Sequence, residues 1–99
     1  MKNDGHSIVT ALRDHGIDVS ACLATWGEAL DLLAAVEALA RAGGASVVVK
    51  VDGGRPGGSL YTLVISGGCF GESFFRKDAE DLMSLLGEGL RFYLDGRDE

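Results

Sequence analysis

Two runs of strand-forming residues, joined by a short link of glycine and proline, most constrain what this chain can fold into. Val47, Val49 and Val51 alternate with other side chains across residues 45–52. A second run covers residues 59–66, and the link between the runs reads Gly-Gly-Arg-Pro-Gly-Gly. This pattern predicts an antiparallel β-hairpin. Because the second run carries apolar side chains on both faces, we expect it to lie inside a sheet.

Two helices are expected before the hairpin. Asp4 is placed to cap a first helix over residues 5–15, and Gly16 to end it in the left-handed conformation. The broad apolar face of residues 26–42 predicts a second helix, which the following Gly-Gly pair should stop. Residues 17–24 fit either a short strand of period two or the first turns of one long helix. The long helix is favoured, because Ala, Leu and Cys suit it and strand-forming residues are few.

A short third strand over residues 73–76 and a final helix are predicted after the hairpin. Asp78 is placed to cap this helix, and Asp95-Gly96 to end it. The expected order is helix, helix, hairpin, short strand, helix. It defines an α+β fold in which the helices pack on one face of a small antiparallel sheet built on the hairpin. The length of 99 residues predicts one domain, residues 1–99.

Cysteine and histidine usage predicts neither a metal site nor a cofactor. Cys22 and Cys69 have no metal-ligand spacing, and one helix cannot present both His6 and His15 to the same ion. The first residues contain no apolar signal-peptide core, and no stretch is apolar enough to span a bilayer. We therefore expect a soluble cytoplasmic protein with free thiols and no membrane attachment.

The acidic side chains concentrate near the end of the chain. The formal net charge is −6, of which residues 78–99 carry −5 with seven acidic and two basic side chains. Such a segment repels a phosphate backbone, which disfavours nucleic-acid binding, and attracts a basic protein partner. Acidic residues at the C-terminal end of a helix oppose its dipole, so they need another reason, which is either a basic partner or, more simply, solubility. The predicted partner-binding residues are Glu88, Asp95, Asp98, Arg55 at an exposed hairpin tip, and Phe70, which we expect to be exposed in a loop.

No arrangement of side chains in the sequence is typical of an enzyme. In size, acidity and layout the chain resembles small bacterial partner-binding proteins such as immunity proteins, a likeness of type that no motif carries. The sequence therefore predicts a non-enzymatic protein-binding module. Its concrete form would be an immunity-like or antitoxin-like inhibitor of a basic toxin or nuclease.

Two alternatives from other classes remain open. The first is a small-molecule-binding or thiol-dependent domain, in which a glycine-rich loop formed by Gly67, Gly68, Cys69 and Gly71 holds the ligand or activates the thiol. No base is tied to Cys69 by the sequence. The second is a structural subunit that forms a homodimer, because a sheet of two or three strands has edges that need cover.

Overall fold

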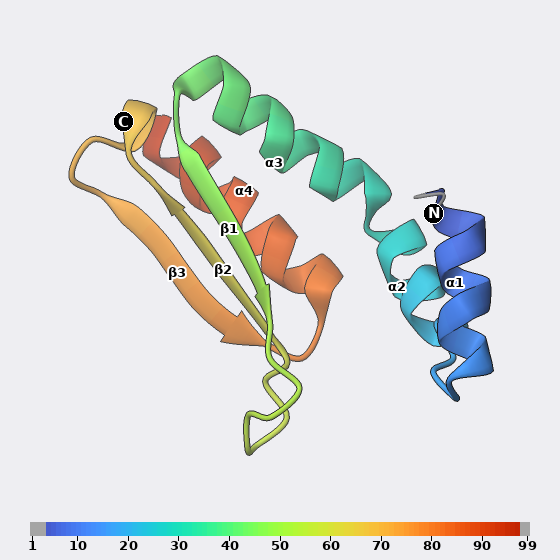
Figure 1. Cartoon of the computed structure of the whole chain (residues 1–99). Coiled ribbons are helices and arrows are strands. Elements are labelled where there is room, and N and C mark those ends of the chain that lie inside the picture. Colours follow the sequence, from blue (N-terminus) through green and yellow to red (C-terminus); the bar gives the residue numbers. More distant parts are fainter. Residues whose placement is uncertain (1–3, 98–99) are drawn as a thin grey trace.

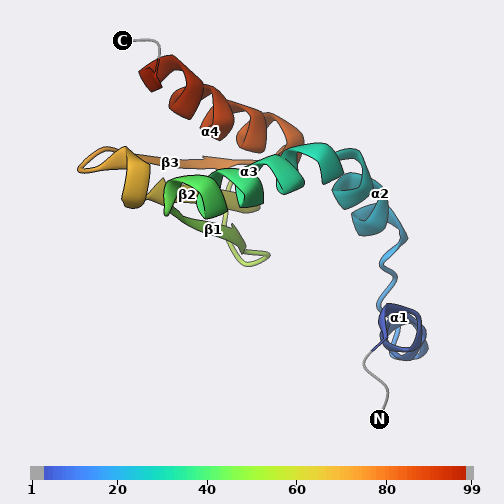
Figure 2. The ribbon, with the colours of Figure 1, turned by 90° about the horizontal axis from the view of Figure 1, so that it is seen from above.

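The computed structural model describes residues 4–97 and has the α+β fold that the sequence predicts (Figure 1). Its elements are α1 (Gly5–Asp14), α2 (Ser20–Glu28), α3 (Leu30–Gly43), β1 (Ser46–Val51), β2 (Tyr61–Ser66), the 3-10 turn η1 (Gly68–Phe70), β3 (Phe74–Ala79) and α4 (Leu82–Arg97). The strands form one antiparallel sheet in the order β1-β2-β3. Figure 2 shows α3 and α4 on one side of this sheet and no helix on the other.

The apolar core lies between α4 and the central strand β2. Alternate residues of β2 face the helices, and every third or fourth residue of α4 faces the strand, as the two periodicities require. The buried core consists of Tyr61, Leu63 and Ile65 from β2, Leu82, Leu85 and Leu86 from α4, and Ala29 and Val36 from the preceding helical region. The prediction that residues 59–66 form an interior strand is therefore confirmed.

Gly89 allows α4 to lie directly on β2. A β-carbon at this position would lie 2.7 Å from Leu63 Cδ2 and 3.1 Å from Ile65 Cδ1. Both side chains are fully buried, so they have little room to move aside. Read from the sequence, this glycine only weakens a helix. In the fold, its missing side chain sets the distance between helix and sheet.

Residues 17–24 contribute to a helix, but the single long helix is interrupted. α2 begins at Ser20, whose backbone N–H donates to Asp18 Oδ1 at 3.0 Å. The chain then turns at Ala29, between α2 and α3, and Ala29 is fully buried in the core. The turn lets α3 lie along the sheet while α2 continues outward (Figure 1).

The third strand is longer than predicted, and this changes the role of Asp78. Because β3 extends to Ala79, Asp78 stands opposite Thr62 in the sheet and does not cap the last helix. Asp81 takes that place, since its carboxylate accepts the backbone N–H of Ser84 at 3.0 Å. The pairing of β3 with the whole of β2 therefore prevails over the helix-capping signal at Asp78. At its other end α4 continues through Asp95-Gly96 to Arg97, past the predicted stop.

Both predicted ends of α1 are confirmed. The backbone N–H of Ser7 donates to Asp4 Oδ1 at 2.8 Å. Gly16 has a φ of +84°, and the N–H of Ile17 returns to the carbonyl of Leu12 at 2.9 Å. No residue of α1 is buried, and the helix stands apart from the rest of the molecule (Figure 2).

The two glycines of α4 offer a matched test of this packing. A β-carbon on Gly87 would meet nothing within 4 Å, so Gly87→Ala should stabilise the fold by about 0.5–1 kcal/mol through helix propensity. Gly89→Ala gains the same propensity but forces overpacking, and should lower the free energy of unfolding by about 1 kcal/mol or more. Urea denaturation of both variants measures the contrast. Equal stabilisation by the two would show that Gly89 does not set the helix–sheet distance.

Candidate functional site

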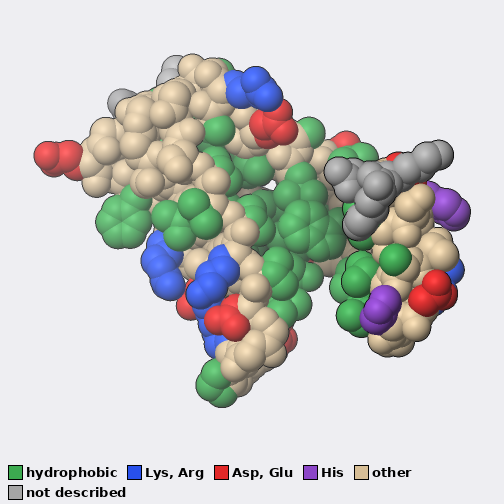
Figure 3. Space-filling view, in the orientation of Figure 1, with side chains coloured by type: hydrophobic (Ala, Val, Ile, Leu, Met, Phe, Trp, Pro, Cys, Tyr) green, Lys and Arg blue, Asp and Glu red, His purple; other side chains and the backbone are tan. Residues whose placement is uncertain are grey.

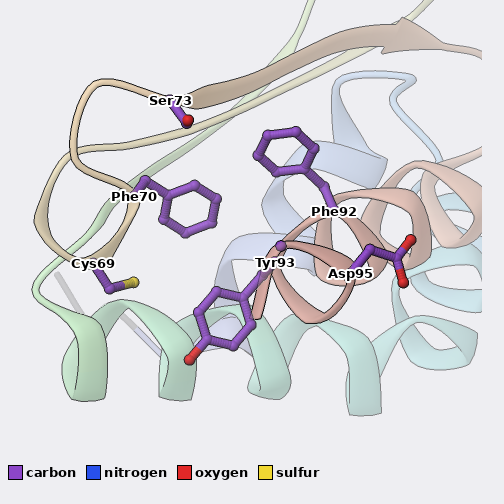
Figure 4. Close-up of a pocket in the computed structure, with 7 residues that line it drawn as sticks. Cys69, Phe70, Ser73, Phe92, Tyr93 and Asp95 are labelled. Carbon is purple, nitrogen blue, oxygen red and sulfur yellow. The ribbon is translucent and has the colours of Figure 1, made fainter. Parts of the chain in front are cut away.

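A cleft opens at one end of the sheet, between η1 and the last turns of α4 (Figure 4). Its volume is about 460 Å³. The residues that line it are Cys69, Phe70, Ser73, Phe92, Tyr93, Asp95 and Gly96. Small-molecule sites occupy roughly 300–1,000 Å³, so this cleft can take a small ligand or a single side chain of a protein partner.

Aromatic rings form the wall of the cleft. Phe70 stacks on Phe92 with ring centroids 5.8 Å apart and planes 12° apart, and it lies 5.7 Å from the ring of Tyr93. Phe92 in turn packs on Phe75 of β3 at 5.7 Å. These separations fall in the range of favourable aromatic pairs. Phe70, predicted to be an exposed loop residue, is therefore half-buried and held between η1 and α4.

The glycine-rich loop owes its shape to packing against the end of α3. A β-carbon on Gly68 would collide with the backbone of Gly43 and Gly44, and Gly68 has a φ of +51°. A β-carbon on Gly43 would likewise collide with the Cys69 sulfur. The close packing of this loop on α3 therefore explains why Gly43 and Gly68 are glycines, without any ligand. Gly67 and Gly71 are the remaining members of the predicted ligand-binding loop, and both also have positive φ.

Cys69 is an exposed free thiol on the rim of the cleft. The other free cysteine, Cys22, is also exposed and lies on α2. His6 lies in α1 and His15 directly after it, at the opposite end of the molecule from η1 (Figure 1). Neither histidine can therefore serve Cys69 as a base in this arrangement.

The five predicted partner-binding residues do not form one patch. Phe70 and Asp95 both line the cleft, and in Figure 4 the Asp95 carboxylate points away from the rings, on the side opposite the Cys69 thiol. Glu88 is exposed but is paired with Lys77 of β3, with 2.6 Å between Nζ and Oε1. Asp98 lies outside the described residues.

The prediction of an exposed Arg55 at the hairpin tip is wrong. Only 20% of its side chain is exposed, because it folds back against the sheet. Its Nη1 lies 3.0 Å from Asp78 Oδ1 and donates to the carbonyl of Ser59 at 3.1 Å. Arg55 therefore closes the base of the hairpin loop.

Asp78 is the centre of this network on the open face of the sheet. Thr62 Oγ1 donates to its Oδ1 at 2.5 Å, and Arg76 Nη1 lies 3.7 Å from its Oδ2. The Thr62 hydrogen bond is the main cause that holds the pKa of Asp78 below 3.8, and the positive charges of Arg55 and Arg76 add to it. Sequence reasoning missed this group, because its members meet only through the register of β2 and β3.

The described part of the chain contains neither a cluster of possible metal ligands nor a helix that could span a membrane. Residues 4–97 contain no group of three or more His, Cys, Asp or Glu side chains that could hold a metal ion. Among the same residues, no helix is long and apolar enough to cross a bilayer.

No protein-family model, curated protein or solved structure matches this chain.

The Thr62–Asp78 hydrogen bond can be tested by titration. Because the folded-state pKa of Asp78 is depressed, its contribution to stability is complete above the ordinary value of 3.8 and is lost as the pH falls through the folded pKa. Thr62→Val removes the largest cause and should raise the pKa of Asp78 towards 3.8. An NMR titration of the carboxyl carbon measures it. Ser66→Ala, on the same face of β2, should leave this pKa unchanged. An unmoved pKa in Thr62→Val would rule out the hydrogen bond as its cause.

Proposed function

We propose that this protein is a non-enzymatic protein-binding module that receives a basic side chain of its partner in the aromatic cleft. The observation that carries the proposal is that Phe70, Tyr93 and Asp95 all line one cleft. The sequence predicts Phe70 and Asp95 as partner-binding residues for different reasons, one as an aromatic residue in a loop and the other as an acid near the C-terminal end of a helix. Their shared position supports one binding site.

Aromatic rings beside a carboxylate suit a guanidinium or ammonium group. A cation over an aromatic face gains roughly 0.5–1 kcal/mol at an exposed site. A carboxylate adds a charge-assisted hydrogen bond, and arginine can make two such bonds in parallel. The rings of Phe70, Phe92 and Tyr93 are already packed against one another, so little ordering of the wall is needed on binding.

The charge of the chain supports the same class of partner. Residues 78–99 hold −5 of the net −6, so a basic protein would be steered towards the α4 side of the molecule. Asp95 is the acid on α4 that lines the cleft, whereas Glu88 is engaged with Lys77. Asp98 belongs to the same acidic segment and remains part of the proposal. Inhibition of a basic toxin or nuclease is the form of this function that we favour.

An arginine-rich peptide tests the proposal without knowledge of the partner. Titration of the protein with hexa-arginine, followed by NMR, should move the signals of Phe70, Tyr93 and Asp95 first. Asp95→Asn should weaken binding about three- to fivefold, the loss expected for one exposed charge pair. Added salt should weaken binding further.

Asp31→Asn provides the matched control for this titration. Asp31 lies in the first turn of α3, is exposed, and its change removes the same charge from another surface. It should leave the affinity near that of the wild type. Equal losses of affinity in Asp31→Asn and Asp95→Asn would mean that peptide binding depends only on the net charge of the protein. Signal changes confined to residues outside the cleft would reject it as the binding site.

A small-molecule or thiol-dependent function is a second candidate, because Cys69 lines the same cleft. Cys22 provides an internal control, since both thiols are free and exposed. If the loop activates Cys69, then Cys22→Ser, which keeps Cys69, should react with iodoacetamide several times faster than Cys69→Ser, which keeps Cys22. Stopped-flow or mass-spectrometric rates measure the difference. Equal rates, at the level of a cysteine in a short peptide, would dismiss the thiol function.

A further inference from the structure

The chain exposes more surface than a compact protein of its size. Its accessible surface is 6768 Å², whereas a folded monomer of 10.4 kDa should expose about 5,400 Å². Its radius of gyration is 15.7 Å, against about 13 Å for a compact domain of this length. The excess of about 1,400 Å² is larger than the roughly 800 Å² that each partner buries in a standard interface.

The helix α1 accounts for part of this excess. It is ten residues long, and helices shorter than about 12–15 residues are marginal in water unless they pack against something. Its apolar side chains are Ile8, Val9, Ala11 and Leu12, which lie at helical spacing, yet none of them is buried. Ile8 remains 42% exposed. An amphipathic helix with this surface lacks a partner within the described chain.

A matching apolar recess lies between β1 and the helices. From the Gly44 turn, β1 and α3 diverge (Figure 1). On the helix-facing side of β1, Val47 and Val49 pack against the core, whereas Val51 at the open end is 54% exposed. Figure 3 shows apolar side chains gathered in this recess and on the side of α1 that faces it. The wedge, defined as the space between β1 and α2–α3, is therefore an uncovered part of the core.

A short segment with local hydrogen bonds at each end joins α1 to α2. At its start, the N–H of Ile17 returns to the carbonyl of Leu12 at 2.9 Å. At its end, Asp18 Oδ1 accepts both the backbone N–H and the hydroxyl of Ser20, at 3.0 and 2.7 Å. These hydrogen bonds order the two ends of the segment, and α1 extends away from the sheet beyond it (Figure 2).

We propose that a second copy of this chain covers these surfaces, with α1 of each copy seated in the wedge of the other. Each chain carries both complementary surfaces, and a reciprocal exchange between two copies gives a two-fold symmetric dimer. Docking of an amphipathic helix in an apolar groove is a common recognition mode. The excess surface is sufficient for a stable interface of this kind. The inference does not depend on the cleft, which lies at the other end of the molecule.

Sedimentation equilibrium of the full chain, with two substitutions and a matched control, tests the dimer. The wild type should be a dimer. Ile8→Asp on α1 and Val51→Asp in the wedge should each weaken it at least about tenfold, since either would bury an unpaired carboxylate. Val48→Asp lies on the same strand, and Val48 is 52% exposed on the opposite face, so this variant should dimerise like the wild type. Circular dichroism checks that each variant folds.

Mixing the two weakened variants tests the arrangement. Ile8→Asp retains an intact wedge and Val51→Asp an intact α1, so a mixed dimer has one native contact and one contact that carries both substitutions. A contact that one carboxylate has already broken loses little more from a second, because neighbouring substitutions are not additive. The mixture should therefore contain more dimer than either variant alone. No gain on mixing would overturn the exchange and indicate α1–α1 or edge-strand pairing.

Two further outcomes would also overturn the proposal. A wild-type chain that stays monomeric up to millimolar concentration has no such dimer, and a radius of gyration below 15.7 Å in solution would then place α1 in its own wedge. A loss of dimer in Val48→Asp equal to that in Val51→Asp would assign the interface to the open face of the sheet. Arginine-peptide binding at Asp95 is read out separately, so either proposal can fail without the other.

Discussion

The close contact between α4 and β2 is the packing on which the rest of the structure depends. Gly89 makes it possible, because any side chain there would meet Leu63 and Ile65. Once α4 lies on the central strand, the fully buried leucines of its first turns complete the core. The same approach brings Phe92 and Tyr93 of its later turns against Phe70 of η1. The cleft is thus a consequence of how the core is packed.

The register of the sheet determines the polar network around Asp78. Because β3 pairs with β2 along its whole length, Asp78 lies beside Thr62 on the face that no helix covers. Arg55 returns from the hairpin loop to this carboxylate. On the covered face, Lys77 reaches Glu88 of α4. Successive side chains of a strand point to opposite faces of the sheet. Lys77 therefore lies on the face covered by α4, and Asp78 lies on the open face beside the hairpin loop.

The sequence predicted those parts of the fold that depend on neighbours close in the chain. The hairpin, its interior strand and both ends of α1 follow from local patterns, and all are found. Asp78 carries the same helix-capping signal as Asp81, and only pairing with a strand 16 residues away decides between them. The predicted exposure of Arg55 was wrong for the same reason, because the carboxylate that holds it belongs to a different strand, β3. Phe70 and Asp95 were predicted only as partner-binding residues. Their place along one cleft depends on the packing of α4, which no local pattern contains.

A three-stranded sheet with two covering helices cannot enclose all the apolar surface of this chain. Only β2 is buried on both sides, and the outer end of β1 keeps Val51 exposed because α3 diverges from it. α1 is a short amphipathic helix that points away from this surface, and none of its residues is buried. We propose that the α1 helix of a second copy covers the exposed end of β1. The cleft, at the far end of the sheet, would stay free in each copy of such an assembly.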